Sequence, residues 1–293
     1  MLKVHQIHKT IEGNDVLQDI SFTLERGSIA GMVGRNGVGK STLLRTIVGI
    51  FDPDSGTVTI DDIDVHKNPA IKQKITYVPD SSELLKSYSV KDIVKLYDAV
   101  YENFDAGYFY HLMNRFGLPK KKLRSYSKGM KALFHMILSF STKSEYIILD
   151  EPTNGLDPIV KRQILTFIIE EVSERNVCVL ISTHHLDEIE KIADTVITLK
   201  EGRIGSFTTI EEAKNSFRKV QTVFTDGLPD AVAALPNVKV LNTTGRVTTL
   251  LINGNIKESL SVISGFEPLF IEELPMSLED IFISTLGGEE YVS

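Results

Sequence analysis

The stretch Gly34-Arg-Asn-Gly-Val-Gly-Lys-Ser-Thr42 decides the fold of this chain. From Gly34 to Ser41 it fits the pattern G-x-x-x-x-G-K-[ST], a glycine-rich loop whose backbone N–H groups can surround phosphates. The apolar run 28–33 leads into the loop, and apolar residues at helical spacing follow it. The loop is therefore expected to join a strand to a helix whose positive N-terminal end favours anions.

Within this loop, two side chains have specific chemistry. Lys40 can reach the β- and γ-phosphates of a nucleoside triphosphate, and the Ser41 hydroxyl can ligate Mg²⁺. The residues that we expect to contact the nucleotide are Gly34, Asn36, Gly37, Gly39, Lys40, Ser41 and Thr42.

A second motif, Tyr146-Ile-Ile-Leu-Asp-Glu151, places two acids at the end of an apolar run. Asp150, at the tip of a buried strand, suits the Mg²⁺ shell. Glu151 could polarise a water for attack on the γ-phosphate. Alone, the motif would also be typical of a strand that ends in a turn, but the phosphate loop favours the functional interpretation.

Three further segments make the chain resemble the ATP-binding subunits of ABC transporters. Tyr126-Ser-Lys-Gly-Met130 resembles the signature loop, Asn154-Gly-Leu-Asp157 the D-loop, and Ser182-Thr-His184 the switch-histidine segment. All five segments occur in the family's order, and the resemblance covers the whole chain. The tail Ser277-Leu-Glu-Asp-Ile-Phe282 resembles that of subunits serving two-gene exporters.

The resemblance implies a role for each matching residue. Ser127 and the backbone of Gly129 would contact the γ-phosphate of ATP bound to the opposite subunit, and Asp157 would bridge the two subunits. His184 would hydrogen-bond the γ-phosphate and hold the attacking water, with the adjoining His185 as the weaker candidate.

The chain departs from the family pattern at three places. Ile11 stands where an aromatic ring usually stacks on adenine, so apolar contact remains but the discrimination between ATP and GTP is open. Asp80 replaces the Q-loop glutamine; it could bind Mg²⁺ or its water, but it cannot donate a hydrogen bond when ionised. Lys128 and Met130 replace Gly and Gln of the usual signature, a pattern similar to some exporter subunits.

Composition limits the function classes. The 293 residues include 39 acidic and 32 basic side chains, for a net charge of −7, which argues against a general nucleic-acid binder. The one cysteine, Cys178, excludes an intrachain disulfide and is expected to be a core thiol. Because no apolar run approaches the roughly 18 to 20 residues that span a bilayer, we expect the chain itself to stay in the cytoplasm. The resemblance to ABC transporter subunits implies that a separate permease holds it at the cytoplasmic face of the membrane.

The order of apolar runs and turns predicts the fold class. We expect an α/β protein: a P-loop NTPase cassette over residues 1–212, with a mainly parallel core sheet, an antiparallel β subdomain and a helical subdomain at about 85–142. Residues 213–293 are expected to form a small α+β domain, because their β-α-β-β-α-β order suggests a ferredoxin-like unit with an extra helix.

An aromatic stripe marks the expected helical subdomain. Tyr97, Tyr101, Phe104 and Tyr108 follow one another at steps of 4, 3 and 4 residues, which places them on one helical face. Asp105 and Gly107 could divide that helix into two. Core packing and a docking surface for a partner are both open interpretations.

The leading hypothesis is an ATP-hydrolysing motor subunit of an ABC-2-type exporter. Two subunits, as a homodimer or heterodimer, would bind ATP and Mg²⁺ between them and move a separately encoded permease, with no nucleic-acid partner. Overall similarity suggests export of peptides or amphipathic compounds, as by the phenol-soluble modulin exporters of Gram-positive bacteria.

Two other function classes stay in view. A soluble ABC-type ATPase in translation or DNA repair would usually have a second cassette or a long coiled coil, and the sequence contains neither pattern. A nucleotide-binding regulator without turnover is favoured by Ile11 and Asp80, whereas Glu151 and His184 argue against it.

Overall fold

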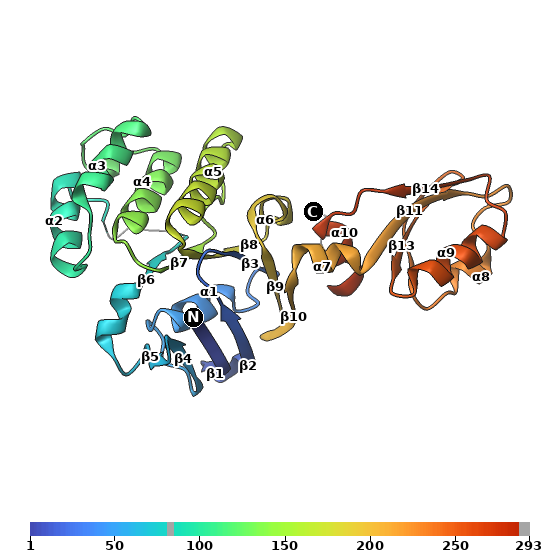
Figure 1. Ribbon diagram of the computed structural model, residues 1–293, viewed down its shortest axis with the longest axis horizontal. Helices are drawn as coiled ribbons and strands as arrows, with labels where there is room; N and C mark the ends of the chain where they lie inside the picture. The colour runs from blue at the N-terminus through green and yellow to red at the C-terminus, as the bar shows by residue number, and fades with distance from the viewer. Residues whose placement is uncertain (81–84, 287–293) are drawn as a thin grey trace. The chain divides into compact units, whose positions relative to one another are not determined.

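The chain folds into two compact units, Met1–Phe207 and Thr208–Ser293 (Figure 1). The computed structural model describes residues 1–80 and 85–286. The boundary precedes helix α7 (Ile210–Asn215), whereas the sequence placed it after residue 212, inside that helix. The Thr209 side chain caps α7 in a reciprocal capping box with Glu212, so the helix forms as one local element. The domain bounds expected from the sequence stay a prediction.

The first unit is built on the six-stranded sheet that was expected to be mainly parallel. Its strand order is β10-β9-β3-β8-β7-β6, and β6, β7, β8, β3 and β9 pair in parallel. β3, β7 and β8 are buried along their whole length, and their sequences are apolar except for Asp150 at the end of β7 and Ser182 and Thr183 at the end of β8. The strands are β3 (Ile29–Val33), β6 (Ile75–Val78), β7 (Tyr146–Asp150), β8 (Cys178–Thr183), β9 (Thr195–Lys200) and β10 (Arg203–Thr209).

A second, antiparallel sheet has the order β2-β1-β4-β5, which confirms the expected β subdomain. The apolar residues of its inner face form one hydrophobic core with β3, β7, β8, β9 and helix α1 (Lys40–Ile47). This shared core fixes the phosphate loop between two sheets. The strands are β1 (Leu2–Ile11), β2 (Asn14–Leu24), β4 (Ser55–Ile60) and β5 (Ile63–Asp64).

The first unit also contains helices and 3-10 turns in addition to α1. Those that fall in the expected helical subdomain are α2 (Val90–Val100), α3 (Ala106–Arg115), the short 3-10 turn η2 (Leu123–Ser125) and α4 (Lys128–Ser141). The others are η1 (Pro69–Lys74), α5 (Pro158–Arg175) and α6 (Leu186–Ile192). Within the described residues, no helix is both long and apolar enough to cross a membrane.

The aromatic stripe belongs to two helices, because Asp105 caps the start of α3. The rings of Tyr97 and Tyr101 stack at 5.6 Å, and Phe104 packs on Tyr97 and on Phe109. Phe109 in turn packs against Phe134 of α4. These rings contact one another, which favours the interpretation as core packing.

After α7, the second unit has the order of elements that the sequence predicted. Its sheet runs β12-β13-β11-β14 with antiparallel pairs throughout, and Val220, Leu250 and Ile263 lie in its core. Its assignment to the ferredoxin-like class stays a prediction. The elements are β11 (Phe217–Val223), α8 (Asp230–Ala233), β12 (Val238–Thr244), β13 (Val247–Asn253), α9 (Ile256–Gly265), β14 (Phe270–Leu274) and α10 (Leu278–Leu286).

Cys178 is a core thiol, as expected. It is 1% exposed at the start of β8, and burial raises its pKa to about 12. Since the thiolate is the reactive form, we expect the native protein at pH 8 to react with a thiol reagent at least about 100-fold more slowly than the chain unfolded in guanidinium chloride. Absorbance of the released chromophore measures both rates; rapid stoichiometric labelling of the native protein would contradict this burial.

Candidate nucleotide-binding site

The phosphate loop lies between β3 and α1, as the sequence predicted. Gly37 and Gly39 have φ values of 80° and 107°, a left-handed backbone that favours glycine. A Cβ atom at Gly39 would lie 2.9 Å from the Val16 carbonyl oxygen, so this glycine is also required for close approach to β2. The loop's shape therefore depends on its glycines before any ligand is considered.

Lys40, the first residue of α1, is folded back onto the loop. Its Nζ donates to the carbonyl oxygens of Gly34 at 2.7 Å and Arg35 at 3.2 Å, and it lies 3.7 Å from Oε1 of Glu151. Burial lowers the pKa of Lys40, while the carboxylates of Glu151 and Asp150 oppose that shift. The lysine thus joins the phosphate loop to the end of β7.

Asp150 is buried at the end of β7, and both of its oxygens accept hydrogen bonds. The Ser182 hydroxyl donates to Oδ1 at 2.6 Å, and the Tyr77 hydroxyl donates to Oδ2 at 3.0 Å. Burial and the charge of Asp150 raise the pKa of Tyr77 to about 12, so its phenol keeps its proton. Tyr77 and the Ser182 side chain were not singled out as site residues from the sequence, although Ser182 lies in the expected switch-histidine segment.

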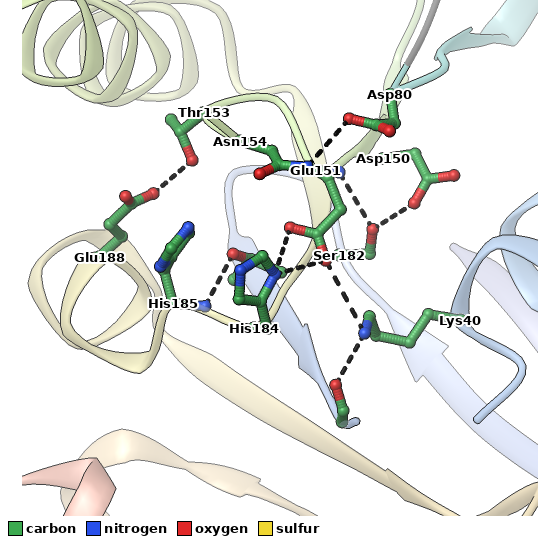
Figure 2. Close-up of polar contacts among 12 residues, drawn as sticks. Lys40, Asp80, Asp150, Glu151, Thr153, Asn154, Ser182, His184, His185 and Glu188 are labelled. Carbon is green, nitrogen blue, oxygen red and sulfur yellow. Dashed lines mark hydrogen bonds and ion pairs between the residues drawn. The ribbon is translucent and has the colours of Figure 1, made fainter. Parts of the chain in front are cut away.

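Glu151 lies in a turn with a left-handed backbone, at φ 48°. Its N–H donates to the Ser182 carbonyl oxygen at 3.0 Å, which holds the turn against the end of β8. Its side chain is mostly buried, and Nδ1 of His184 lies 3.0 Å and 3.1 Å from its two oxygens. Figure 2 shows Lys40, Glu151 and His184 converging from three separate segments. A non-glycine residue held in this conformation is a form of local strain that clusters at functional sites.

The His185 ring packs beside that of His184, with 4.0 Å between the ring centroids. Burial and then the neighbouring His184 ring lower its pKa, and its backbone N–H donates to the Thr183 hydroxyl. His184 makes the contact with Glu151, so the geometry favours it over His185 as the sequence did.

A cavity of about 720 Å³ opens above the phosphate loop. A pocket of this size suits a small-molecule ligand. The predicted site residues that line it are Ile11, Asn36, Gly37, Gly39, Lys40, Ser41, Thr42, Asp80, Glu151 and His184. Ile11 lines this cavity, and its contact with the base stays a prediction.

Asp80 borders the cavity beside a residue from the expected D-loop. Nδ2 of Asn154 approaches Oδ1 of Asp80 at 3.5 Å, and both residues line the cavity together with Glu151. The Asp80 carboxylate is exposed, which leaves it accessible to a ligand in this cavity.

Ser127, Gly129 and Asp157 are not among the described residues that line the cavity. Ser127 caps α4 by accepting from the Met130 N–H at 3.2 Å. Asp157 caps α5 by accepting from two backbone N–H groups at 3.1 Å. A Cβ atom at Gly129 would lie 3.1 Å from Val160, so the start of α4 packs closely on the first turn of α5. The three residues form a separate surface of the same unit.

A glycine loop between a parallel strand and a helix, with an acidic pair at the end of a neighbouring strand, defines a P-loop nucleotide-binding ATPase. Comparison with known proteins gives the family. Residues 17–154 match the family model of ABC transporters. The chain is 36% identical over 290 residues to the ABC transporter ATP-binding protein YtrB of Bacillus subtilis, covering 99% of each protein. It is 29% identical over 207 residues to the lantibiotic transport ATP-binding protein SrtF of Streptococcus pyogenes, covering 70% of this chain and 89% of SrtF.

Solved structures agree with this assignment. An ATP-binding subunit of an ABC transporter matches with a TM-score of 0.67 at 25% identity, over 73% of this chain and 92% of that subunit. The cbiO1 protein of Clostridium perfringens, part of the ABC transporter complex cbiONQ, matches with a TM-score of 0.62 at 28% identity, over 72% and 89%. The chain therefore belongs to the ABC transporter family. It is an ATP-binding subunit whose ATPase activity is coupled to transport through a transmembrane permease.

Proposed function

We propose that this chain is the ATPase subunit of an exporter of peptides or amphipathic compounds. It works as a dimer at the cytoplasmic face of the membrane, attached to a separately encoded permease. The observation that carries its motor role is the contact of Glu151 with both Lys40 and His184. The similarity to a lantibiotic transport protein and the Tyr126–Met130 signature support the exporter class.

The phosphate loop binds the nucleotide in this proposal. Its N–H groups and the positive end of α1 surround the phosphates, and the Lys40 ammonium leaves the loop carbonyls to contact the β- and γ-phosphates. Ile11 supplies an apolar contact to the base.

Glu151 is the general base. Its carboxylate takes a proton from the water that attacks the γ-phosphorus, and His184 fixes both the carboxylate and the water. If Nδ1 of His184 donates to Glu151, Nε2 of the neutral ring accepts a hydrogen bond, as from the attacking water. Nε2 donates to the γ-phosphate only when the ring is protonated.

Ser127, Gly129 and Asp157 serve the nucleotide of a second subunit. They do not line the cavity of their own unit, and the first turn of α4 offers a hydroxyl and unhindered N–H groups that suit an anion. Completion of the site in a dimer explains why residues with phosphate-binding chemistry lie on a separate surface. The isolated monomer should therefore be a poor ATPase.

The residues around the cavity fit a magnesium ion. Mg²⁺ prefers oxygen ligands and is commonly held by one or two carboxylates together with substrate phosphates. Ser41 and Asp80 line the cavity and supply such oxygens. The Asp150 carboxylate is the third proposed ligand; it is buried next to Glu151 and is not among the described residues that line the cavity. No group of three or more His, Cys, Asp or Glu side chains with metal-site geometry occurs among residues 1–80 and 85–286, so the phosphates are expected to complete the shell. When bound, the ion neutralises charge on the phosphates.

The Asp80 substitution tests this set. Asp80→Ala is expected to raise the Mg²⁺ concentration for half-maximal ATPase activity by about threefold to tenfold, because one oxygen ligand of the ion or its water is lost. Titration of activity with Mg²⁺ at saturating ATP measures the shift. Asp80→Gln, which restores the family residue and keeps an oxygen, serves as the matched variant. Unchanged Mg²⁺ dependence in both variants would remove Asp80 from the metal site.

The exporter role is tested with the permease. We expect a hydrophobic protein of about six spans, encoded next to this chain, to copurify with it and to raise its ATPase activity. Cationic amphipathic peptides are then expected to stimulate the complex at least about twofold over matched polar peptides. Stimulation by neither class, with an otherwise active complex, would contradict peptide export.

A further inference from the structure

A buried ionic network lies behind the Glu151–His184 pair. Glu188 of α6 is 6% exposed; its Oε2 accepts a hydrogen bond from the Thr153 hydroxyl, and its Oε1 lies 2.9 Å from Nζ of Lys161. Figure 2 shows the contact between Thr153 and Glu188. Glu188, Thr153 and Lys161 are not among the described residues that line the nucleotide cavity.

Each member of the network comes from a different functional segment. Thr153 lies in the turn that starts at Glu151, where the Asn154 N–H donates to the Glu151 carbonyl oxygen. Lys161 lies in the first turn of α5, and its N–H donates to the Asp157 carbonyl oxygen. Glu188 lies in the first turn of α6, and its N–H donates to the carbonyl oxygen of His185.

Burial gives these contacts their strength. A carboxylate removed from water destabilises the fold unless it is paired and hydrogen-bonded, so Glu188 strongly favours the arrangement in which both partners reach it. Thr153 is 1% exposed, and its hydroxyl donates to Glu188. The network therefore restricts movement of the turn that contains Glu151 relative to the segment that contains His184.

We propose that Glu188 is a positioning residue for ATP hydrolysis. Through Thr153 it holds the turn of Glu151, and through the start of α6 it holds His184, so that the carboxylate and the ring stay in contact. Through its ion pair with Lys161, Glu188 also holds the start of α5, the helix that Asp157 caps. The inference rests on the proposed function of Glu151 and His184. Loss of their positioning would slow hydrolysis, because a displacement of about 1 Å at a reacting group can reduce the rate by up to about 100-fold.

Thr153→Val tests the link directly, since it keeps the shape of the side chain and removes the hydroxyl. We expect kcat of the dimeric, permease-bound ATPase to fall by about tenfold, while KM and the Kd for a non-hydrolysable ATP analogue stay within about twofold. Thr153→Ser restores the hydroxyl and is expected to recover at least about half of the wild-type kcat. A purely structural role would lower the melting temperature without separating kcat from KM.

Glu188→Gln is an independent test, because the substitution preserves the volume of the side chain and keeps one oxygen that can accept a hydrogen bond. We expect a smaller fall in kcat, of about threefold to fivefold, because Gln still accepts from Thr153 but no longer pairs with Lys161. Asp187→Asn is the control: it removes a neighbouring carboxylate of α6 that forms only an exposed ion pair with Lys191, and it should behave as the wild type.

The outcomes separate this inference from the proposed function. If Thr153→Val and Glu188→Gln match Asp187→Asn in kcat while Glu151→Gln is inactive, the positioning role of Glu188 is overturned and the general base stands. If Glu151→Gln hydrolyses ATP normally, the proposed function itself fails. If Thr153→Val does not fold, as judged by circular dichroism, Glu188→Gln decides the question alone.

Discussion

Glu151→Gln is expected to reduce ATP turnover by at least about 100-fold while nucleotide binding is retained. The amide keeps the size of the side chain and one oxygen that can face Nδ1 of His184, but it cannot take the proton of the attacking water. ATP should consequently stay bound between two subunits, and the dimer should accumulate. Phosphate release measures turnover, and size-exclusion chromatography with ATP and Mg²⁺ measures the trapped dimer.

Glu174→Gln is the matched control for this variant. Glu174 is an exposed carboxylate on α5, outside the cavity, so its neutralisation should leave both turnover and the monomer–dimer balance unchanged. Normal hydrolysis by Glu151→Gln would show that the polarising carboxylate lies elsewhere. Slow hydrolysis without an ATP-dependent dimer would instead contradict the proposal that Ser127 and Gly129 act across a subunit interface.

The parts of the site that are consecutive in the chain were predictable from sequence. The glycines of the phosphate loop at 34–42 themselves indicate the left-handed backbone that the loop needs. Asp150 and Glu151 follow directly on an apolar run. Helix starts were similarly local: Ser89 and Asp92 form the capping box that their spacing indicates. Such features need no information about distant residues.

The contacts between segments were not predictable in the same way. Asp150 meets Ser182 because β7 and β8 pair in parallel with these two residues opposite each other, and this register is a property of the sheet. Tyr77 of β6 lies opposite Ile148 in the neighbouring pair, and its hydroxyl reaches Asp150, two residues further along β7. Glu188 carried no motif at all, and its network with Thr153 and Lys161 exists only once α5 and α6 pack together.

The expected domain boundary shows a related limit. Residues 208–212 continue a strand into a capped helix, so no composition change marks the division. No glycine- or proline-rich linker lies at this place in the sequence. The remaining signal is the helical spacing of apolar residues, which begins only after the boundary between the two compact units.

Lys40→Met is expected to abolish most nucleotide binding. The ammonium is the buried cation of the phosphate loop, and burial has already removed part of its hydration, so its contact with phosphates is only weakly screened. We expect the Kd for a non-hydrolysable ATP analogue to rise by about 100-fold. At a concentration of about 100 times the wild-type Kd, the analogue should stabilise the wild type by about 2.7 kcal/mol and the variant by only about 0.4 kcal/mol.

Thermal unfolding with and without the analogue measures this difference, and Lys72→Met is the control. Lys72 also donates its Nζ to a glycine carbonyl oxygen, that of Gly49 at 3.0 Å, but it does so at the opposite end of α1 and outside the cavity. The control should lose some stability without analogue and keep the full ligand-induced shift. If the analogue stabilised Lys40→Met against unfolding as much as the wild type, Lys40 would be excluded from phosphate binding. Its role would then be structural, through its hydrogen bonds to the Gly34 and Arg35 carbonyl oxygens.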